Sequence, residues 1–145
     1  MTTTDPARTT SGVTWKSTLV AATIGAAGGL LVTTLIAWAA RTLFDVPTEF
    51  QQLTLPVYGT LTVVGVLIGA IGWRLIVNRS RNAGRLLSRL VPTVLVLSLI
   101  PDVLLLVSDS QPGTTVSGVV ALMLMHLGIA AAAVPAYRRF MPPQS

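Results

Sequence analysis

The chain contains 145 residues, of which 52% are hydrophobic and only 10% are charged. Because a soluble domain normally carries about 25% charged residues, this composition excludes an ordinary soluble domain and indicates a protein of the lipid bilayer. The absence of cysteine excludes a disulfide, a thiolate metal site and a cysteine nucleophile. The net charge of +5 could suggest nucleic acid. In so apolar a chain we interpret the basic residues by their positions along it, and we expect no nucleic-acid partner.

Four apolar segments account for most of the chain. They are preceded by residues 1–15, which are rich in Thr, Pro, Gly and Ser and predict a disordered cytoplasmic tail. A membrane-spanning helix needs ~20 apolar residues, so the remainder has room for four spans and short connections. We predict an all-α, integral membrane four-helix transmembrane bundle over residues 16–140. The predicted spans are about 17–40, 54–77, 90–107 and 114–136.

The first span has an alternative interpretation as a signal peptide. Ala37, Trp38 and Ala39 form an A-x-A-like cleavage site after a basic start. The apolar stretch exceeds the usual 7–15-residue core of a signal peptide, which favours a retained membrane helix.

The positions of Lys and Arg predict the orientation of the bundle. By the positive-inside rule, the side that carries most of them faces the cytoplasm. Both termini and the middle connection should therefore be cytoplasmic, in a multi-pass protein of the cell membrane. Only Arg41 falls on the other side. The other nine are Arg8, Lys16, Arg74, Arg79, Arg81, Arg85, Arg89, Arg138 and Arg139.

Small residues predict where the helices pack. Helix association within lipid relies on close backbone approach, which glycine permits. The first span has a GxxxG pair at Gly25 and Gly29, and the second has another at Gly65 and Gly69. We expect these two spans to cross there. Contact between copies in a homo-oligomer is the alternative use of the glycines.

The third span contains an ionisable carboxylate, Asp102, directly after Pro101. Its thirteen Leu, Ile and Val residues each contribute roughly −0.3 to −0.6 kcal/mol to insertion, against about +2.5 to +3.5 kcal/mol for Asp, so the helix inserts. Such a carboxylate normally faces the bundle interior or a wet cavity. We expect a kink that frees the carbonyl of Leu97, and we expect Ser98 on the same face one turn deeper.

Counting depth along the helices selects partners for Asp102. At ~1.5 Å per residue, Asp102 lies ~10 Å below the outer boundary and His126 lies ~15 to 18 Å below it. The axial gap of ~5 to 8 Å is too long for a direct hydrogen bond, which leaves a bridging water or a kink. The preferred partners, at matching depth or at the rim above, are Tyr58, Thr60, Thr62 and Arg41.

Two interpretations of Asp102 and His126 are open. In one, they line a polar cavity for a proton or a small cation. In the other, each satisfies polar groups of a neighbouring helix. A copper site is disfavoured, because Met123 and Met125 point to different sides of a helix. We expect no metal and no cofactor and, since no catalytic motif is recognisable, no enzymatic activity.

The connections carry their own signals. Arg81, Arg85 and Arg89 recur every four residues and predict a short surface helix that binds anionic headgroups at the cytoplasmic side of the bilayer. A second interfacial helix is expected in the outer connection, with Asp45 as its N-cap. The side chains expected to face lipid there are Leu43, Phe44 and Phe50.

The fourth span carries a family resemblance. Its sequence "ALMLMHLGIAAAAVPAYRR", with the run Leu124, Met125, His126 and the later Pro135, resembles the last helix of an uncharacterised, mostly actinobacterial family of small four-span membrane proteins, the domain of unknown function 6069. The resemblance implies four spans over about 16–139 and makes His126 interesting, but it implies no substrate. We therefore predict a small non-enzymatic membrane component that packs with itself or another membrane protein. The alternative is a small transporter or proton-responsive element that uses Asp102 and His126.

Overall fold

The computed structural model describes residues 12–108 and 111–143, and within these ranges every regular element is a helix. This confirms the predicted all-α, four-helix architecture. Residues 1–11 of the predicted tail, with Arg8, lie outside the described residues. The elements are α1 (Trp15–Leu43), the 3₁₀ helix η1 (Gln51–Leu53), α2 (Leu55–Arg79), α3 (Ala83–Ser108) and α4 (Val116–Phe140).

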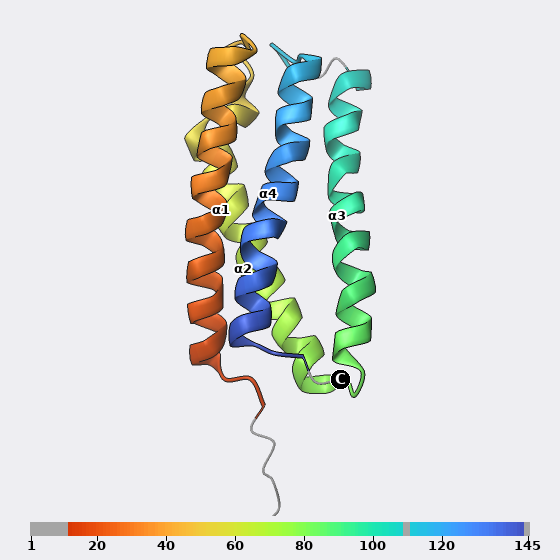
Figure 1. Ribbon diagram of the computed structural model, residues 1–145. Coiled ribbons are helices and arrows are strands. Elements are labelled where there is room, and N and C mark those ends of the chain that lie inside the picture. The colour runs from red at the N-terminus through yellow and green to blue at the C-terminus, as the bar shows by residue number, and fades with distance from the viewer. Residues whose placement is uncertain (1–11, 109–110, 144–145) are drawn as a thin grey trace, which may run out of the picture.

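Each of the four α-helices is long and apolar enough to cross a membrane, with a mean hydropathy of 2.0 to 2.4 over its most apolar part. The helices alternate in direction (Figure 1). The start of α1, the α2–α3 connection and the end of α4 lie together at what we call the basic end. The α1–α2 and α3–α4 connections lie at the opposite end, where Arg41 is the basic residue in the last turn of α1.

The third helix begins at Ala83, earlier than the predicted boundary near residue 90. Arg85 and Arg89 therefore belong to the first turns of α3, and the separate surface helix predicted for this segment is wrong. The helix starts earlier than predicted because its apolar periodicity continues back to Leu87. That side chain is only 3% exposed, because it packs with Trp73 in the core at the basic end. Pro92 consequently lies inside the helix.

Helix α1 packs on both α2 and α4 through the small-residue stripe that contains Gly25 and Gly29, both of which are buried. A Cβ atom at Gly25 would lie 3.2 Å from the Cα atom of Ala133 on α4 and 3.3 Å from Val66 Cγ1 on α2. At Gly29 it would lie 3.0 Å from Thr62 Cγ2. The first GxxxG pair therefore allows both helices to approach α1.

The second GxxxG pair does not face α1, so the expected crossing through both pairs is wrong. Helix α2 turns a buried stripe that includes Thr62 and Val66 toward the core, and Gly65 and Gly69 lie beside this stripe. Nothing lies within 4 Å of a Cβ position at Gly65, and the nearest atom at Gly69 is the hydroxyl of Tyr137, 3.1 Å away. Gly65 thus borders open space, and Gly69 lies against Tyr137 of α4 and not against α1.

The connection after α1 closes the opposite end of the bundle with Phe50, which is fully buried. Its ring lies against Gly118 at the start of α4, where a Cβ atom would come within 3.0 Å of it. The prediction that Phe50 faces lipid is therefore wrong, whereas Leu43 and Phe44 are exposed as expected. Asp45 adopts a positive φ of 49°, and the residue that caps η1 is Phe50, so the predicted N-cap role of Asp45 is also wrong.

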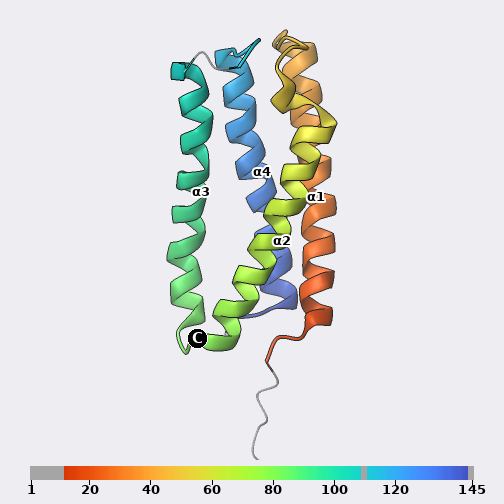
Figure 2. The same ribbon diagram turned by 180° about the vertical axis from the view of Figure 1, so that it is seen from behind.

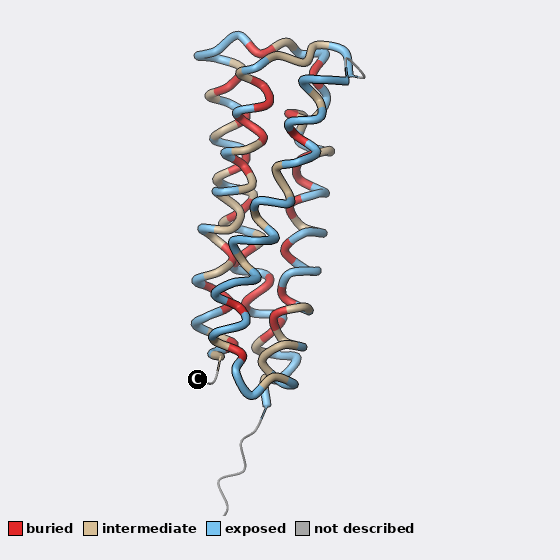
Figure 3. The backbone as a smooth tube through the Cα atoms, turned by 90° about the vertical axis from the view of Figure 1, so that its right-hand side faces the viewer, coloured by how far each residue is buried: buried red, intermediate tan, exposed pale blue. Residues whose placement is uncertain are grey.

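Helix α3 is the least enclosed of the four. Its buried residues are Ala83 and Leu87 near the basic end and Asp102 near the opposite end. Helix α2 crosses the bundle obliquely, from the side of α1 at the opposite end toward α3 at the basic end (Figure 2). Buried and exposed positions alternate along the helices (Figure 3). Between Leu87 and Asp102, α3 contributes no buried side chain to the bundle.

Candidate functional site

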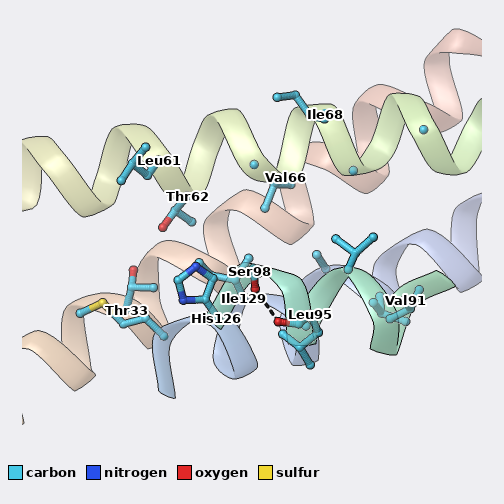
Figure 4. Close-up of a pocket in the computed structure, with 18 of the residues that line it drawn as sticks. Thr33, Leu61, Thr62, Val66, Ile68, Val91, Leu95, Ser98, His126 and Ile129 are labelled. Carbon is cyan, nitrogen blue, oxygen red and sulfur yellow. Dashed lines mark hydrogen bonds between the residues drawn. The ribbon is translucent and has the colours of Figure 1, made fainter. Parts of the chain in front are cut away.

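A cavity of about 770 Å³ lies between α2, α3 and α4 (Figure 4). Most of its wall is apolar. Its polar side chains come from several helices, and among them are Thr62, Ser98, Asp102 and His126. The cavity therefore combines an apolar body with a small number of polar groups at membrane depth, which is the usual composition of a ligand pocket.

Asp102 is the ionisable group that faces this cavity from α3, and it is only 6% exposed. Its Oδ2 atom lies 3.1 Å from Nδ1 of His126 on α4. The two side chains are therefore closer than the predicted axial gap of ~5 to 8 Å indicated, although no hydrogen bond joins Asp102 Oδ2 to the imidazole among the described residues. The structure brings together the two intramembrane ionisable groups that the sequence singled out.

The direction of the Cα–Cβ bonds explains this contact. Every such bond in an α-helix tilts toward the helix N-terminus. Helix α3 starts at the basic end and α4 starts at the opposite end, so Asp102 leans toward the basic end and His126 leans away from it. The two side chains thus converge across the gap that a count of Cα positions leaves between them.

The imidazole has a second close neighbour, because Nδ1 of His126 also lies 2.9 Å from the carbonyl oxygen of Leu122. A nitrogen that faces two acceptor oxygens must carry its hydrogen. That hydrogen satisfies hydrogen-bond geometry toward Leu122, whereas Asp102 Oδ2 has no hydrogen-bond partner among the described residues. The carboxylate oxygen thus lies beside the imidazole without a donor, and the two side chains form an ion pair only when the ring is protonated.

Thr62 and Ser98 line the same cavity and differ in their hydrogen bonding. Thr62 on α2 is 1% exposed, and its Oγ1 atom is buried without a hydrogen-bond partner in the described part of the chain. Its side chain and the ring of His126 point toward the same space (Figure 4). Ser98 donates its hydroxyl to the carbonyl of Leu95 at 2.7 Å, within its own helix. Ser98 therefore lines the cavity without serving Asp102.

The other preferred partners of Asp102 are engaged elsewhere, so that prediction is wrong. Tyr58 donates its hydroxyl to Thr34 on α1 at 3.2 Å. Arg41 donates to the carbonyl of Leu53 at 3.1 Å and so satisfies the end of η1. Thr60 is exposed.

The basic end holds contacts that the sequence did not indicate. Arg74 lies 3.9 Å from the centroid of the Trp15 ring and donates to the carbonyl of Val13 at 3.1 Å. The backbone N–H of Val13 donates to Oδ1 of Asn78 at 2.8 Å. The sequence feature that could have indicated these contacts is an arginine and an asparagine one turn apart at the end of α2. Arg81, Arg85 and Arg89 are exposed at this end.

Four apolar helices of membrane length, with an Asp–His contact between two of them, define the class as a multi-pass helical membrane protein. Comparison with protein-family models then identifies the family. Residues 10–142 match the Family of unknown function (DUF6069), and the chain belongs to it, as the sequence of its fourth span predicted. No curated protein and no solved structure matches the chain. The function must therefore be argued from the geometry.

Proposed function

We propose that the protein is a non-enzymatic, proton-responsive element of the cytoplasmic membrane, in which the charge state of Asp102 and His126 controls how α3 packs against α4. The observation that carries the proposal is the 3.1 Å contact between Asp102 Oδ2 and His126 Nδ1 in the wall of a 770 Å³ cavity. Ionisable residues within membrane spans are expensive to insert, and they commonly mark proton or ion pathways.

The position of Asp102 on α3 makes this helix sensitive to charge. Asp102 is the buried residue of α3 nearest the opposite end, and the other two, Ala83 and Leu87, lie near the basic end. Adding a proton to a neutral imidazole creates an ion pair with the carboxylate, and a further proton on the carboxylate removes it. Attachment of α3 near the opposite end should therefore be strongest when imidazolium and carboxylate are both present.

Other titratable groups near the pair do not compete with it. Tyr58 of α2 and Tyr137 of α4 also line the cavity, and their hydroxyls donate to Thr34 Oγ1 and to the carbonyl of Val66. Among the described residues, no Lys, Arg or Glu side chain lines it. Histidine is the side chain whose charge ordinarily changes between pH 5 and 8. The proposed response therefore belongs to this pH range.

The proposed orientation has both termini in the cytoplasm. It is supported by the gathering of Lys and Arg at the basic end, together with the positive-inside rule. The exposed Arg81, Arg85 and Arg89 fit anionic lipid headgroups at that surface, each contributing ~1 kcal/mol. A non-enzymatic role is supported by the hydroxyl of Ser98, which donates to its own helix and so forms no nucleophile–base pair with His126.

A distance measurement between α1 and α3 tests the proposal. Because the chain lacks cysteine, Leu35→Cys and Leu104→Cys supply two unique spin-label sites, and both residues are exposed. We expect a shorter and narrower distance distribution in liposomes at pH 5.5 than at pH 8.5. Asp102→Asn and His126→Gln should each abolish the change, and Ser98→Ala should retain it. A wild-type distribution that does not change with pH would refute the proposal.

A second candidate function is assembly with another copy of the chain. The observation that favours it is the open space beside Gly65 and Gly72, where a Cβ atom would have no neighbour within 4 Å. Both glycines line the cavity, which is open beside the exposed Leu61 and Ile68, so a helix of a second copy that packed on them would fill this opening. If copies pack there, Gly65→Ile should abolish the dimer captured by cross-linking in membranes, and Leu31→Ala, at an exposed position of α1, should not. A monomeric wild-type protein would exclude this candidate.

A further inference from the structure

We propose that the cavity between α2, α3 and α4 binds a lipophilic amine, a molecule with a cationic N–H head on an apolar body. The ammonium group would donate to Asp102 Oδ2 and Thr62 Oγ1. This inference shares the carboxylate of the proposed function and adds to it a class of ligand.

The polar part of the cavity has two deficits: two buried oxygens receive no hydrogen bond, and among the described residues no Lys or Arg side chain lines it. Asp102 Oδ2 and Thr62 Oγ1 are both buried and have no hydrogen-bond partner among the described residues. They come from different helices and line the same cavity. A carboxylate only accepts hydrogen bonds, and the nearby imidazole directs its Nδ1 hydrogen to Leu122. A ligand that brings N–H groups and a positive charge matches both deficits, whereas an anion matches neither.

An organic cation fits better than a bare metal ion. Calcium takes six to eight oxygen ligands, and magnesium demands a nearly complete octahedron. In the described part of the chain, no group of three or more His, Cys, Asp or Glu residues is placed to hold a metal ion. An ammonium group needs only a few acceptors, and the apolar wall can bury the rest of its molecule.

The apolar part of the cavity has room for that molecule. Its volume of about 770 Å³ lies within the range of ~300–1,000 Å³ typical of pockets for drug-sized ligands. On α2, Gly65 and Gly72 leave their side of the wall empty, with nothing within 4 Å of a Cβ position. Val94 and Leu95 of α3 form part of the facing wall. A hydrocarbon or aromatic body would lie between the glycines and these side chains.

Entry from the bilayer is consistent with the exposure of the wall. Leu61 and Ile68 of α2 line the cavity and yet are 65% and 66% exposed, so the cavity opens between helices toward the surrounding lipid. A phospholipid is a poorer occupant than an amine, because its phosphate would meet the carboxylate of Asp102. That carboxylate also lies ~9 Å along α3 from Ser108, deeper than a headgroup layer.

The test compares two fluorescent probes that differ at one end. N-dansyl-1,8-diaminooctane carries a terminal ammonium at pH 8, since alkylamines titrate near ~10.4, and its N-dansyl-8-aminooctanol counterpart carries a neutral hydroxyl. Binding is measured by fluorescence on the full chain in lipid nanodiscs, after subtraction of partitioning into empty nanodiscs. We expect the wild-type protein to bind the amine at least tenfold more tightly than the alcohol.

Variants test separately where the ammonium group and the apolar body of the ligand bind. Asp102→Asn should remove the preference for the amine, and Ser98→Ala, on the same face of α3, should keep it. Gly72→Leu should fill the apolar part and weaken both probes by a similar factor. This variant leaves the polar groups intact, so it keeps the proposal testable if Asp102→Asn fails to fold. Equal affinity of the two probes for the wild type, or an unchanged preference in folded Asp102→Asn protein, would overturn the proposal.

The spin-label measurement without any amine separates this inference from the proposed function. If the distance between α1 and α3 responds to pH and the probes bind equally, the amine site alone is refuted. If the amine preference depends on Asp102 and the distance ignores pH, the proton response alone is refuted.

Discussion

The contact between Asp102 and His126 predicts a pH-dependent coupling energy. The perturbation is a double-mutant cycle that consists of Asp102→Asn, His126→Gln and the variant carrying both substitutions. Such a cycle isolates the interaction between two side chains from the other effects of each substitution. The free energy measured is that of unfolding in mixed micelles of mild detergent and SDS, and the two pH values are 5.5 and 8.5.

The geometry sets the expected magnitude. Two unit charges separated by 3.1 Å attract by about 5 kcal/mol at an effective dielectric constant of ~20. Desolvation and the ordering of the two side chains offset much of this, and the imidazole is 34% exposed, which lowers it further. We therefore expect a net coupling of about 1.5 kcal/mol at pH 5.5, near the lower limit measured for contacts of charged groups.

The sign of the pH dependence follows from the imidazole. An ion pair with the carboxylate requires a protonated ring, and a histidine ordinarily changes its charge between pH 5 and 8, so we expect the coupling at pH 5.5 and not at pH 8.5. At pH 8.5 the Nδ1 hydrogen serves Leu122, and we expect no more than about 0.5 kcal/mol of coupling to Asp102. Equal coupling at the two pH values, or a larger value at pH 8.5, would refute this account of the pair.

Three further predictions concern packing. Gly25→Val adds a side chain whose Cβ atom would lie 3.2 Å from the backbone of α4, and it should lower the unfolding free energy by about 1–3 kcal/mol. Gly65→Val, beside open space, should change the unfolding free energy by less than about 0.5 kcal/mol. Phe50→Ala removes a fully buried ring and should cost about 3 kcal/mol in the same assay, in contrast to the exposed Phe44→Ala. Arg74→Gln removes the cation–π contact at 3.9 Å, worth about 0.5–1 kcal/mol, and should accelerate amide exchange just before α1; unchanged exchange would argue against this clamp.

The sequence predicted the parts of the fold that depend on composition along the chain. Four spans follow from the length of the apolar segments, because lipid forces backbone hydrogen bonds to close within each helix. The start of α3 was misplaced because Arg85 and Arg89 indicated a surface helix, although Leu87 continues the apolar period into the core. Charge at a helix end and charge on a surface helix give the same local pattern.

The sequence could not predict which segment packs against each helix face. Gly25 was identified as a packing residue, but its neighbour on α4, Ala133, belongs to an alanine-rich run that offers several equivalent positions. Phe50 was expected to face lipid because a phenylalanine in a short connection suits either environment. Its burial depends on the notch at Gly118, which exists only after α4 has packed. These errors concern contacts between distant segments, for which one sequence holds no pairing signal.

The Asp–His contact was missed because depth was counted along Cα positions, and its presence bears on why α3 carries a carboxylate at all. Pro101 lacks a backbone N–H and leaves the carbonyl of Leu97 without its helical partner, so α3 is weakened beside Asp102. With only three buried residues, two of them near the basic end, an apolar α3 could rotate against lipid at little cost.

The carboxylate removes that freedom. Rotation of α3 by one residue, ~100°, would turn Asp102 from His126 toward hydrocarbon, where an Asp costs up to about 2.5–3.5 kcal/mol, the value at the centre of a span. A single buried charge with one partner thus fixes the rotation of a helix that packing leaves poorly specified. Because the partner is a histidine, we expect the strength of this constraint to change with proton concentration. An Asp102→Leu variant should accordingly keep α3 in the membrane and leave its rotation undetermined, so that cysteines placed around the helix become equally accessible from lipid.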